Sequence, residues 1–224
     1  MNRNNKGSRL LTNQAYEYIK AKLLSYEFPP DMLLSESSLS KELKMSRTPI
    51  REALYILKVD GLLKEEGSKW KVLGITLEDL KQIFELKIAV ENLITEEVAR
   101  LPFSEKADIR ECLEKTRSAA TSGDRILWRK YDHELHDCIF RHSHNSRAIK
   151  FIYQNNGQWQ RFLYRYVVLD LAKSQRQHEE FVGYILEGKP DKAKESYTAH
   201  LNSLREEIEY VLKQMVFPFS NNQI

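Results

Sequence analysis

The stretch SRTPIREAL, residues 46–54, decides the fold of the N-terminal third of this chain. Ser46 or Thr48 can cap a helix here, and Pro49 suits its first turn, where a missing backbone N–H costs little. Apolar side chains then recur at helical spacing and predict one buried stripe. The stripe consists of Ile50, Ala53, Leu54 and Leu57. Asp60-Gly61 predicts the end of this helix, because glycine readily adopts the left-handed conformation found there.

The segments around this helix complete the order of a winged helix-turn-helix. Apolar residues at helical spacing predict a first helix that Pro29-Pro30 ends, and Ser35 is placed to cap a short second helix. After the third helix, two strand-like pieces flank a glycine-containing turn, which is a hairpin signal. In order, we expect a helix over 12–27, a helix after Ser35, the helix from Ser46, and strands at 62–64 and 70–73.

Arg47 and Arg51 lie four residues apart near the start of the third helix, on the face opposite the apolar stripe. A recognition helix needs this arrangement, because an arginine in the major groove can bond the O6 and N7 atoms of guanine as a fork. The hydroxyls of Ser46 and Thr48 suit phosphate, and the basic wing tip at 67–69 suits the DNA backbone or the minor groove. From spacing alone the arginines can equally form a solvated face; the helix-turn-helix-wing order favours DNA binding.

The charge of the chain is divided unequally along its length. Residues 1–74 hold 13 Lys and Arg against 9 Asp and Glu, whereas the remainder holds 22 against 23, so the positive excess lies in the first third. No apolar run approaches the roughly 20 residues of a membrane span, and the polar start MNRNNKGSR is no secretory signal. Cys112 and Cys138 form no CxxC pair and are interpreted as reduced, mostly buried thiols. We expect a cytoplasmic protein with no membrane partner.

From Thr76 onward the pattern is helical and contains no convincing strand. Six helical segments are expected, at about 77–101, 104–122, 124–142, 146–170, 173–188 and 190–216. Their short connections favour antiparallel neighbours. The aromatic and arginine run at 159–166 is interpreted as core, pocket wall or dimer interface rather than as a nucleic-acid stacking surface. The predicted fold class is mostly α, with a winged helix-turn-helix domain over 9–74 and an all-α antiparallel helical bundle over 75–217.

Three histidines and one aspartate are candidates for a metal site. Asp132 and His136 are four residues apart and share one helical face, whereas His178 and His200 lie on later segments. One carboxylate and three imidazoles suit a first-row divalent cation and leave positions for water or a ligand. Spacing shows only that the first two residues converge, and such residues also occur as surface or hydrogen-bonded groups. A metal site is therefore one of two interpretations of these four residues.

The stretch 46–54, followed by Leu57 and Asp60-Gly61-Leu62, resembles the GntR family of bacterial repressors over about residues 9–74. The resemblance assigns DNA contacts to Ser46, Arg47, Thr48 and Arg51 and, in the wing, to Gly67 and Lys69. Two positions depart from the family pattern. Asp31 stands where a glycine usually follows proline, and Ser37 stands where some relatives carry an arginine that touches DNA.

Residues 77–216 are similar to the all-helical, ligand-binding FCD domain, and six helices resemble its VanR-like branch. The hallmark of this domain is Asp-x3-His on one helix and one histidine on each of two later helices. The matching residues are Asp132, His136, His178 and His200. The resemblance implies a bound divalent metal (Zn, Ni or Mn) and a small carboxylic acid that coordinates it.

The effector-binding candidates are Lys87, Arg129 and Asn145. Lys87 stands where many FCD domains carry an arginine for the effector carboxylate, and lysine keeps the charge but lacks the planar fork. Arg129 can serve as another cation, and Asn145 matches a position of the family after the third helical segment. The other histidines gain no role and are interpreted as solvated; they are His133, His142 and His144.

These features predict a ligand-responsive transcription repressor, and not an enzyme. A homodimer would place one recognition helix in each half of a palindromic double-stranded DNA operator. A small-molecule effector and a divalent metal in the helical domain would then control DNA binding. Two alternatives stay open: a metal-dependent enzyme in which the four candidate ligands activate water or oxygen, and a metal-free helical adaptor fused to a DNA-binding domain.

Overall fold

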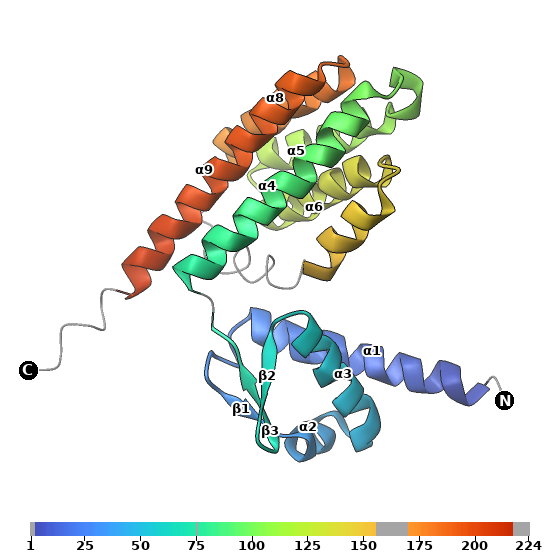
Figure 1. Ribbon diagram of the computed structural model, residues 1–224, viewed down its shortest axis with the longest axis vertical. Helices are drawn as coiled ribbons and strands as arrows, with labels where there is room; N and C mark the ends of the chain where they lie inside the picture. The colour runs from blue at the N-terminus through green and yellow to red at the C-terminus, as the bar shows by residue number, and fades with distance from the viewer. Residues whose placement is uncertain (1–2, 75, 156–169, 217–224) are drawn as a thin grey trace, which may run out of the picture. The chain divides into compact units, whose positions relative to one another are not determined.

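The computed structural model describes residues 3–74, 76–155 and 170–216 (Figure 1). The chain divides into two compact units, with a boundary after Thr76. The first unit is a winged helix-turn-helix and the second is a bundle of helices. The aromatic and arginine run at 159–166 lies outside the described residues, so its predicted role in the core or at an interface stays a prediction.

Three helices and a three-stranded antiparallel sheet form the first unit. They are α1 (Arg3–Leu24), β1 (Leu33–Leu34), α2 (Glu36–Leu43), α3 (Arg47–Val59), β2 (Leu63–Glu66) and β3 (Lys69–Val72). The strand order is β1-β3-β2, so the hairpin of β2 and β3 gains a third strand from the segment before α2. The predicted order of three helices and a hairpin is confirmed. The first helix begins at Arg3 rather than at residue 12, and the two-residue β1 was not predicted.

Local hydrogen bonds set the ends of α2 and the start of α3. The Ser35 hydroxyl accepts a hydrogen bond from the Ser38 amide at 3.1 Å, which confirms its predicted capping role. After α2, Lys44 adopts the left-handed conformation with φ 52°, and its amide donates to the Lys41 carbonyl. Ser46 occupies the N-cap position of α3, but its hydroxyl makes no capping hydrogen bond. Ser46 therefore does not cap α3 through its side chain, as the sequence had suggested, and the residue is exposed at the start of this helix.

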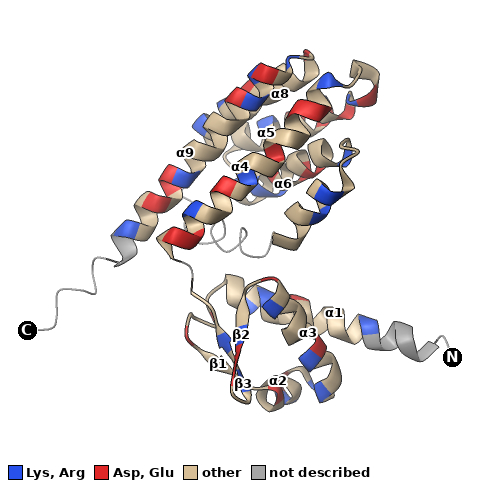
Figure 2. Cartoon of the chain, in the orientation of Figure 1, with Lys and Arg blue, Asp and Glu red and all other residues tan. Residues whose placement is uncertain are grey.

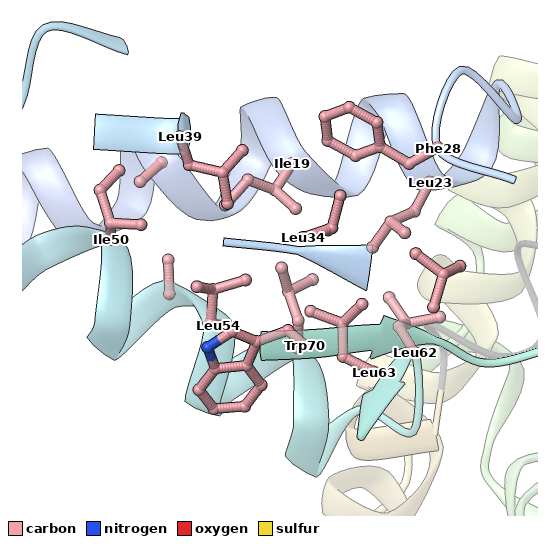
Figure 3. Close-up of a cluster of buried hydrophobic side chains, with 14 residues drawn as sticks. Ile19, Leu23, Phe28, Leu34, Leu39, Ile50, Leu54, Leu62, Leu63 and Trp70 are labelled. Atoms are coloured by element: carbon pink, nitrogen blue, oxygen red, sulfur yellow. The ribbon is translucent and has the colours of Figure 1, made fainter. Parts of the chain in front are cut away.

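One apolar core joins the helices and the sheet of this unit (Figure 3). The predicted stripe of α3 is fully buried in it, and all four members are 0 % exposed: Ile50, Ala53, Leu54 and Leu57. Leu34 of β1 and Trp70 of β3 belong to the same cluster. Because the apolar face of α3 is held in this core, the opposite face projects to solvent.

The second unit is helical throughout its described residues. It contains α4 (Leu77–Arg100), the short 3-10 helix η1 (Phe103–Glu105), α5 (Asp108–Ser122), α6 (Arg125–Arg141), helical residues 146–155, α8 (Leu171–Leu186) and α9 (Pro190–Val216). Each predicted helical segment has a counterpart here, although the fourth is described only as far as residue 155. Between Val72 and Val216 the described part of the chain contains no strand. The mostly helical fold class is confirmed.

Helices distant in sequence pack side by side in this unit. α4 packs along α9, α8 packs against α9, and α5 packs against both α6 and α8. The charged residues of α9 lie toward its two ends, at 191–195 and 205–213, and Figure 2 shows acidic and basic positions interspersed on the helices of this unit. None of the helices in the described ranges has the length and hydropathy that crossing a bilayer requires.

Candidate metal centre and DNA-binding surface

The residues predicted to contact DNA lie on two adjoining parts of the first unit. Ser46, Arg47, Thr48 and Arg51 are exposed at the start of α3, within one and a half turns of each other. Gly67 and Lys69 are exposed at the turn between β2 and β3, where Gly67 has φ 63°. All six are therefore accessible, and they belong to the two elements that a winged helix presents to a duplex.

Arg51 makes a contact that sequence spacing did not predict. Its Nε donates to Glu36 Oε1 at 2.9 Å, and its Nη2 donates to Glu36 Oε2 at 2.8 Å. These hydrogen bonds lower the pKa of Glu36 and keep its carboxylate ionised. Arginine carries five N–H donors, so this fork leaves both Nη1 donors and one Nη2 donor of Arg51 available. The Nη1 atom and the remaining Nη2 hydrogen of Arg51 can therefore still donate to a base edge while Nε and Nη2 bind Glu36.

Asp31 shows how the chain accommodates its departure from the usual glycine. The residue adopts a left-handed conformation with φ 67°, which aspartate tolerates better than most non-glycine residues. Its carboxylate lies 2.7 Å from Lys71 Nζ on β3, and its amide donates to the Val72 carbonyl at 2.9 Å. The turn before β1 is therefore retained and is tied to β3, the central strand of the sheet.

Four side chains from three helices meet inside the second unit. Asp132 Oδ1 lies 2.8 Å from His178 Nε2 and 3.7 Å from His136 Nε2. The Nε2 atoms of His136 and His178 are 3.2 Å apart, and a ring nitrogen of His200 lies within 4.8 Å of both histidines. The convergence of α6, α8 and α9 thus brings together all four residues that were predicted to bind metal.

The histidines of this cluster share one orientation. In each ring Nδ1 faces an outer acceptor: the Ser174 carbonyl accepts from His178 at 2.6 Å, and Gln177 Oε1 accepts from His200 at 3.1 Å. For His136 the partner is the Tyr197 hydroxyl at 3.2 Å. The Nε2 atoms of His136 and His178 face the interior of the cluster, where His178 Nε2 lies beside Asp132 Oδ1. Outer-shell partners of this kind are typical of histidine metal ligands.

Tyr197 links this cluster to a buried carboxylate. Its hydroxyl donates to Glu91 Oε2 at 2.7 Å, so its oxygen is free to accept from His136. Burial raises the pKa of Tyr197, which keeps the phenol protonated as this role requires. Glu91 is 1 % exposed and also binds Lys87 Nζ. The chain Lys87–Glu91–Tyr197–His136 therefore runs from α4 to the candidate ligands on α6.

Burial and charge decide what the cluster can hold. Burial lowers the pKa of His136 to about 3 and lowers that of His200 well below its ordinary value. Burial alone would raise the pKa of Asp132, but the hydrogen bond and charge of His178 hold it well below its usual range. The site thus gathers three imidazoles and one ionised carboxylate in the interior of the helical unit. The nitrogen and oxygen atoms that lie close together can share protons, or all four side chains can ligate one cation; three imidazoles and one carboxylate fit a divalent metal ion.

The effector-binding candidates occupy different surroundings. Lys87 is paired with the buried Glu91, so its charge is already balanced. Asn145 Oδ1 accepts from the Ala148 amide at 3.0 Å and caps the helical residues 146–155, while Arg129 is exposed on α6. The structure joins Lys87 to the cluster through hydrogen bonds and uses Asn145 as a cap. Effector binding by these three residues stays a prediction.

The residues that contact the candidate ligands from outside were not predicted, and one histidine was predicted wrongly. Ser174 precedes its partner His178 by four positions, a spacing that a helix makes visible. Gln177 and Tyr197 lie 23 and 61 positions from their partners His200 and His136, so helical spacing offers no signal for them. His142 was interpreted as solvated, but its Nε2 lies 2.8 Å from Asp108 Oδ1 and its side chain is only 20 % exposed. That interpretation is wrong, because the fold places His142 against the start of α5.

Two family descriptions match the chain in consecutive segments. The description "Bacterial regulatory proteins, gntR family" matches residues 11–69, which include α2, α3 and most of the wing. The description "FCD domain" matches residues 82–203, which include the four candidate metal ligands. The two matches follow the two units of the structure.

Individual relatives agree with these matches. An uncharacterized HTH-type transcriptional regulator of Bacillus subtilis, YdhC, is 28% identical over 90% of this chain and 92% of its own length. The gluconate operon transcriptional repressor of Bacillus licheniformis is 28% identical over 61% of this chain and 56% of its own. Among solved structures, E. coli McbR/YncC has a TM-score of 0.70 at 19% identity and covers 92% of this chain and 98% of its own. A structure titled as a metal-free FCD domain has a TM-score of 0.53 at 22% identity, covering 63% and 99%.

Proposed function

The chain belongs to the GntR family of bacterial regulatory proteins and carries an FCD domain, and from this premise we propose that it is a metal-dependent, ligand-responsive repressor. It is a DNA-binding transcription regulator with an effector-binding domain. Its family and its relatives are regulators and not enzymes, so the metalloenzyme alternative is set aside. Assignment to the VanR-like branch stays a prediction.

The observation that carries the metal proposal is the common orientation of the three histidines. Each ring directs Nδ1 toward an outer partner, and the Nε2 atoms of His136 and His178 lie 3.7 and 2.8 Å from Asp132 Oδ1. We infer that His136, His178, His200 and Asp132 hold one divalent transition metal, namely Zn, Ni or Mn. Three imidazoles and one carboxylate leave coordination positions open for water or an effector oxygen.

A small carboxylic acid is the effector class that suits this centre. A metal held by three neutral imidazoles and one carboxylate keeps a net positive charge, which attracts an anionic oxygen ligand. Lys87 adds no unbalanced charge because Glu91 neutralises it. The metal, rather than the lysine, would therefore supply the main attraction for the carboxylate of the effector.

We propose that the exposed start of α3 and the tip of the wing recognise DNA. Arg47 and Arg51 would read base edges, while Ser46, Thr48, Gly67 and Lys69 would contact phosphate. A homodimer would present two such surfaces to a palindromic operator, one in each half-site. Effector binding at the metal would change the DNA affinity of the dimer, which is a linkage between two sites.

The experiment that tests the proposal selects bound duplexes from a random library with the full-length protein. We expect a two-fold symmetric motif, together with about one equivalent of transition metal per chain after chelator-free purification. An Arg47→Ala/Arg51→Ala variant should lose the motif, and a His136→Ala/His178→Ala variant should lose the metal. Absence of any enriched motif would contradict the DNA-reading assignment, and full metal retention by the histidine variant would contradict the metal assignment.

A further inference from the structure

A second group of metal-ligand side chains lies between α5 and α6, outside the centre described above. Ligand atoms of Asp108, Cys138 and His142 all lie within 4.8 Å of one another. Asp108 and Cys112 are spaced i, i+4 on α5, and Cys138 and His142 have the same spacing at the end of α6, so each pair shares one helical face.

The hydrogen bonds of this group converge on one carboxylate. His142 Nε2 lies 2.8 Å from Asp108 Oδ1, and Cys138 Sγ donates to Asp108 Oδ2 at 3.5 Å. Burial raises the pKa of Cys138, so in the absence of a cation the thiol keeps its proton. A proton on sulfur and a proton on imidazole thus occupy the space among the three ligands. A single divalent cation can replace both.

The separations are close to those of a tetrahedral site. Zinc bonds of about 2.0–2.3 Å place neighbouring tetrahedral ligand atoms about 3.3–3.8 Å apart. The distance from Cys138 Sγ to Asp108 Oδ2 is 3.5 Å and already lies in this range. The distance from His142 Nε2 to the other carboxylate oxygen, Asp108 Oδ1, is 2.8 Å and has to open by about half an ångström. The Asp108 side chain is 53 % exposed and can make that adjustment, and it also leaves an entry path for the ion.

We propose that Asp108, Cys138 and His142 form a second metal site that binds Zn²⁺, and that Cys112, one turn after Asp108 on α5, completes it as the fourth ligand. Two thiolates, one imidazole and one carboxylate are a donor set that favours zinc over the harder divalent cations. Binding releases the thiol protons to solvent as each sulfur becomes a thiolate ligand. The site is separate from the histidine-rich centre, because Cys138 lies two residues beyond His136 and so about 200° around α6.

This second site would tie α6, which carries two ligands of the histidine-rich centre, to α5. α6 carries Asp132 and His136 on one face and Cys138 and His142 on another. An ion clamped between α5 and α6 would fix the position of α6, and hence of the first pair of ligands, without touching the effector. Zinc at this place would therefore stabilise the helical unit and pre-organise the centre.

Cobalt substitution tests the proposal, because only this site contains sulfur. Reduced, metal-free full-length protein is titrated with Co²⁺, and thiolate-to-cobalt charge transfer is followed in the near ultraviolet. We expect the absorption to saturate at one equivalent and the total bound metal to reach two equivalents. Zn²⁺ should abolish the absorption by displacing the cobalt. Absence of the charge-transfer absorption at saturating Co²⁺ would overturn the proposal.

Variants separate ligation from folding. Cys112→Ser and Cys138→Ser should each weaken the absorption, and Asp108→Asn and His142→Gln should raise the Kd for Co²⁺ at least about 10-fold. Asp108 is exposed, so Asp108→Asn stays informative if a change at the buried Cys138 prevents folding. His133→Gln, at an exposed histidine of the same helix, is the matched control and should change nothing. A Kd unchanged in both Asp108→Asn and His142→Gln would contradict the assignment.

The same titration keeps the two sites distinguishable. His178→Asn, in the histidine-rich centre, should remove one equivalent of bound metal and leave the charge-transfer absorption intact. Loss of the histidine-rich centre in such a variant would therefore not count against the thiolate site. Conversely, a total of one equivalent in the wild-type protein, with no sulfur absorption, would leave the first centre standing and refute the second.

Discussion

The winged unit and the helical unit assemble their candidate sites in different ways. In the winged unit, the residues expected to touch DNA follow one another at the start of α3 or lie in one hairpin turn. In the helical unit, the four candidate metal ligands come from α6, α8 and α9, and their outer partners add α4. The first site depends on one helix held by a core, whereas the second exists only when the bundle is folded.

This difference determines how each site should respond to mutation. In the winged unit, single exposed arginines can be removed without disturbing the core that positions them. In the helical unit, an outer-shell change acts on the metal through a ligand that it does not replace. Mutations can therefore distinguish a site held by one helix from a site held by the whole bundle.

The largest effect is expected from removing both arginines of α3. Arg47→Ala/Arg51→Ala should weaken binding to the selected operator by about 2–6 kcal/mol, because each base contact contributes about 1–3 kcal/mol. Metal binding should not change. Titration of labelled operator measures the loss, and Arg100→Ala, which removes an exposed charge from α4, is the control. Equal losses in the control and in the double variant would mean that charge alone, and not base reading, is involved.

A core change in α3 should destabilise the winged unit alone. Leu54 is 0 % exposed, and Leu54→Ala should lower the free energy of unfolding of this unit by about 2–5 kcal/mol. Ile56, on the same helix, is 44 % exposed, so Ile56→Ala serves as the control and should cost far less. Denaturant unfolding, followed alongside metal content, measures both units. A parallel loss of bound metal would contradict the assignment of the metal centre to the helical unit alone.

The same difference between local and long-range contacts decides which features could be predicted from the sequence. The apolar period of α3, the cap at Ser35 and the glycine at 61 are local signals, and each leads to the observed element. The strand β1 escaped prediction because Leu33 and Leu34 are too few to show a period. The fork between Arg51 and Glu36 also escaped, because it joins residues 15 positions apart on two helices.

For the helical unit, sequence periodicity predicted the helices but not which faces meet. Only the i, i+4 pair of Asp132 and His136 was visible from spacing, and the other two ligands rested on family resemblance. The outer partners of the histidines depend on packing between helices, as in the contact of Tyr197 with His136 at 3.2 Å. His142 was misread for the same reason, since its partner Asp108 is 34 residues away. Long-range contacts of this kind leave no periodic signal.

An intermediate effect is expected from the outer shell of the histidine-rich centre. Tyr197→Phe removes the hydroxyl that accepts from His136 and donates to Glu91, while it keeps the ring. Loss of such a partner typically lowers metal affinity about 10–100-fold. Competition with a chromophoric chelator measures the change, and Tyr210→Phe, at an exposed tyrosine of the same helix, is the control. Unchanged metal affinity in Tyr197→Phe would show that His136 does not depend on this hydroxyl.

The smallest effect, and the sharpest test of the winged unit, concerns the contact between Glu36 and Arg51. Glu36→Gln removes the charged fork that holds the side of the guanidinium, so Arg51 should sample more rotamers. Losing a negative charge near DNA should also strengthen non-specific binding, and the two effects oppose each other in total affinity.

The ratio of the affinity for the operator to the affinity for a duplex altered at the base that Arg51 contacts measures the first effect alone. We expect this ratio to fall about 2–5-fold, or about 0.5–1 kcal/mol, as for other exposed ion pairs. Glu42→Gln removes the same charge from the other end of α2, where the carboxylate binds Tyr18, and should leave the ratio unchanged. If both variants preserve discrimination, Arg51 does not need Glu36 for its position, and the recognition surface depends on α3 and the wing without a contribution from α2.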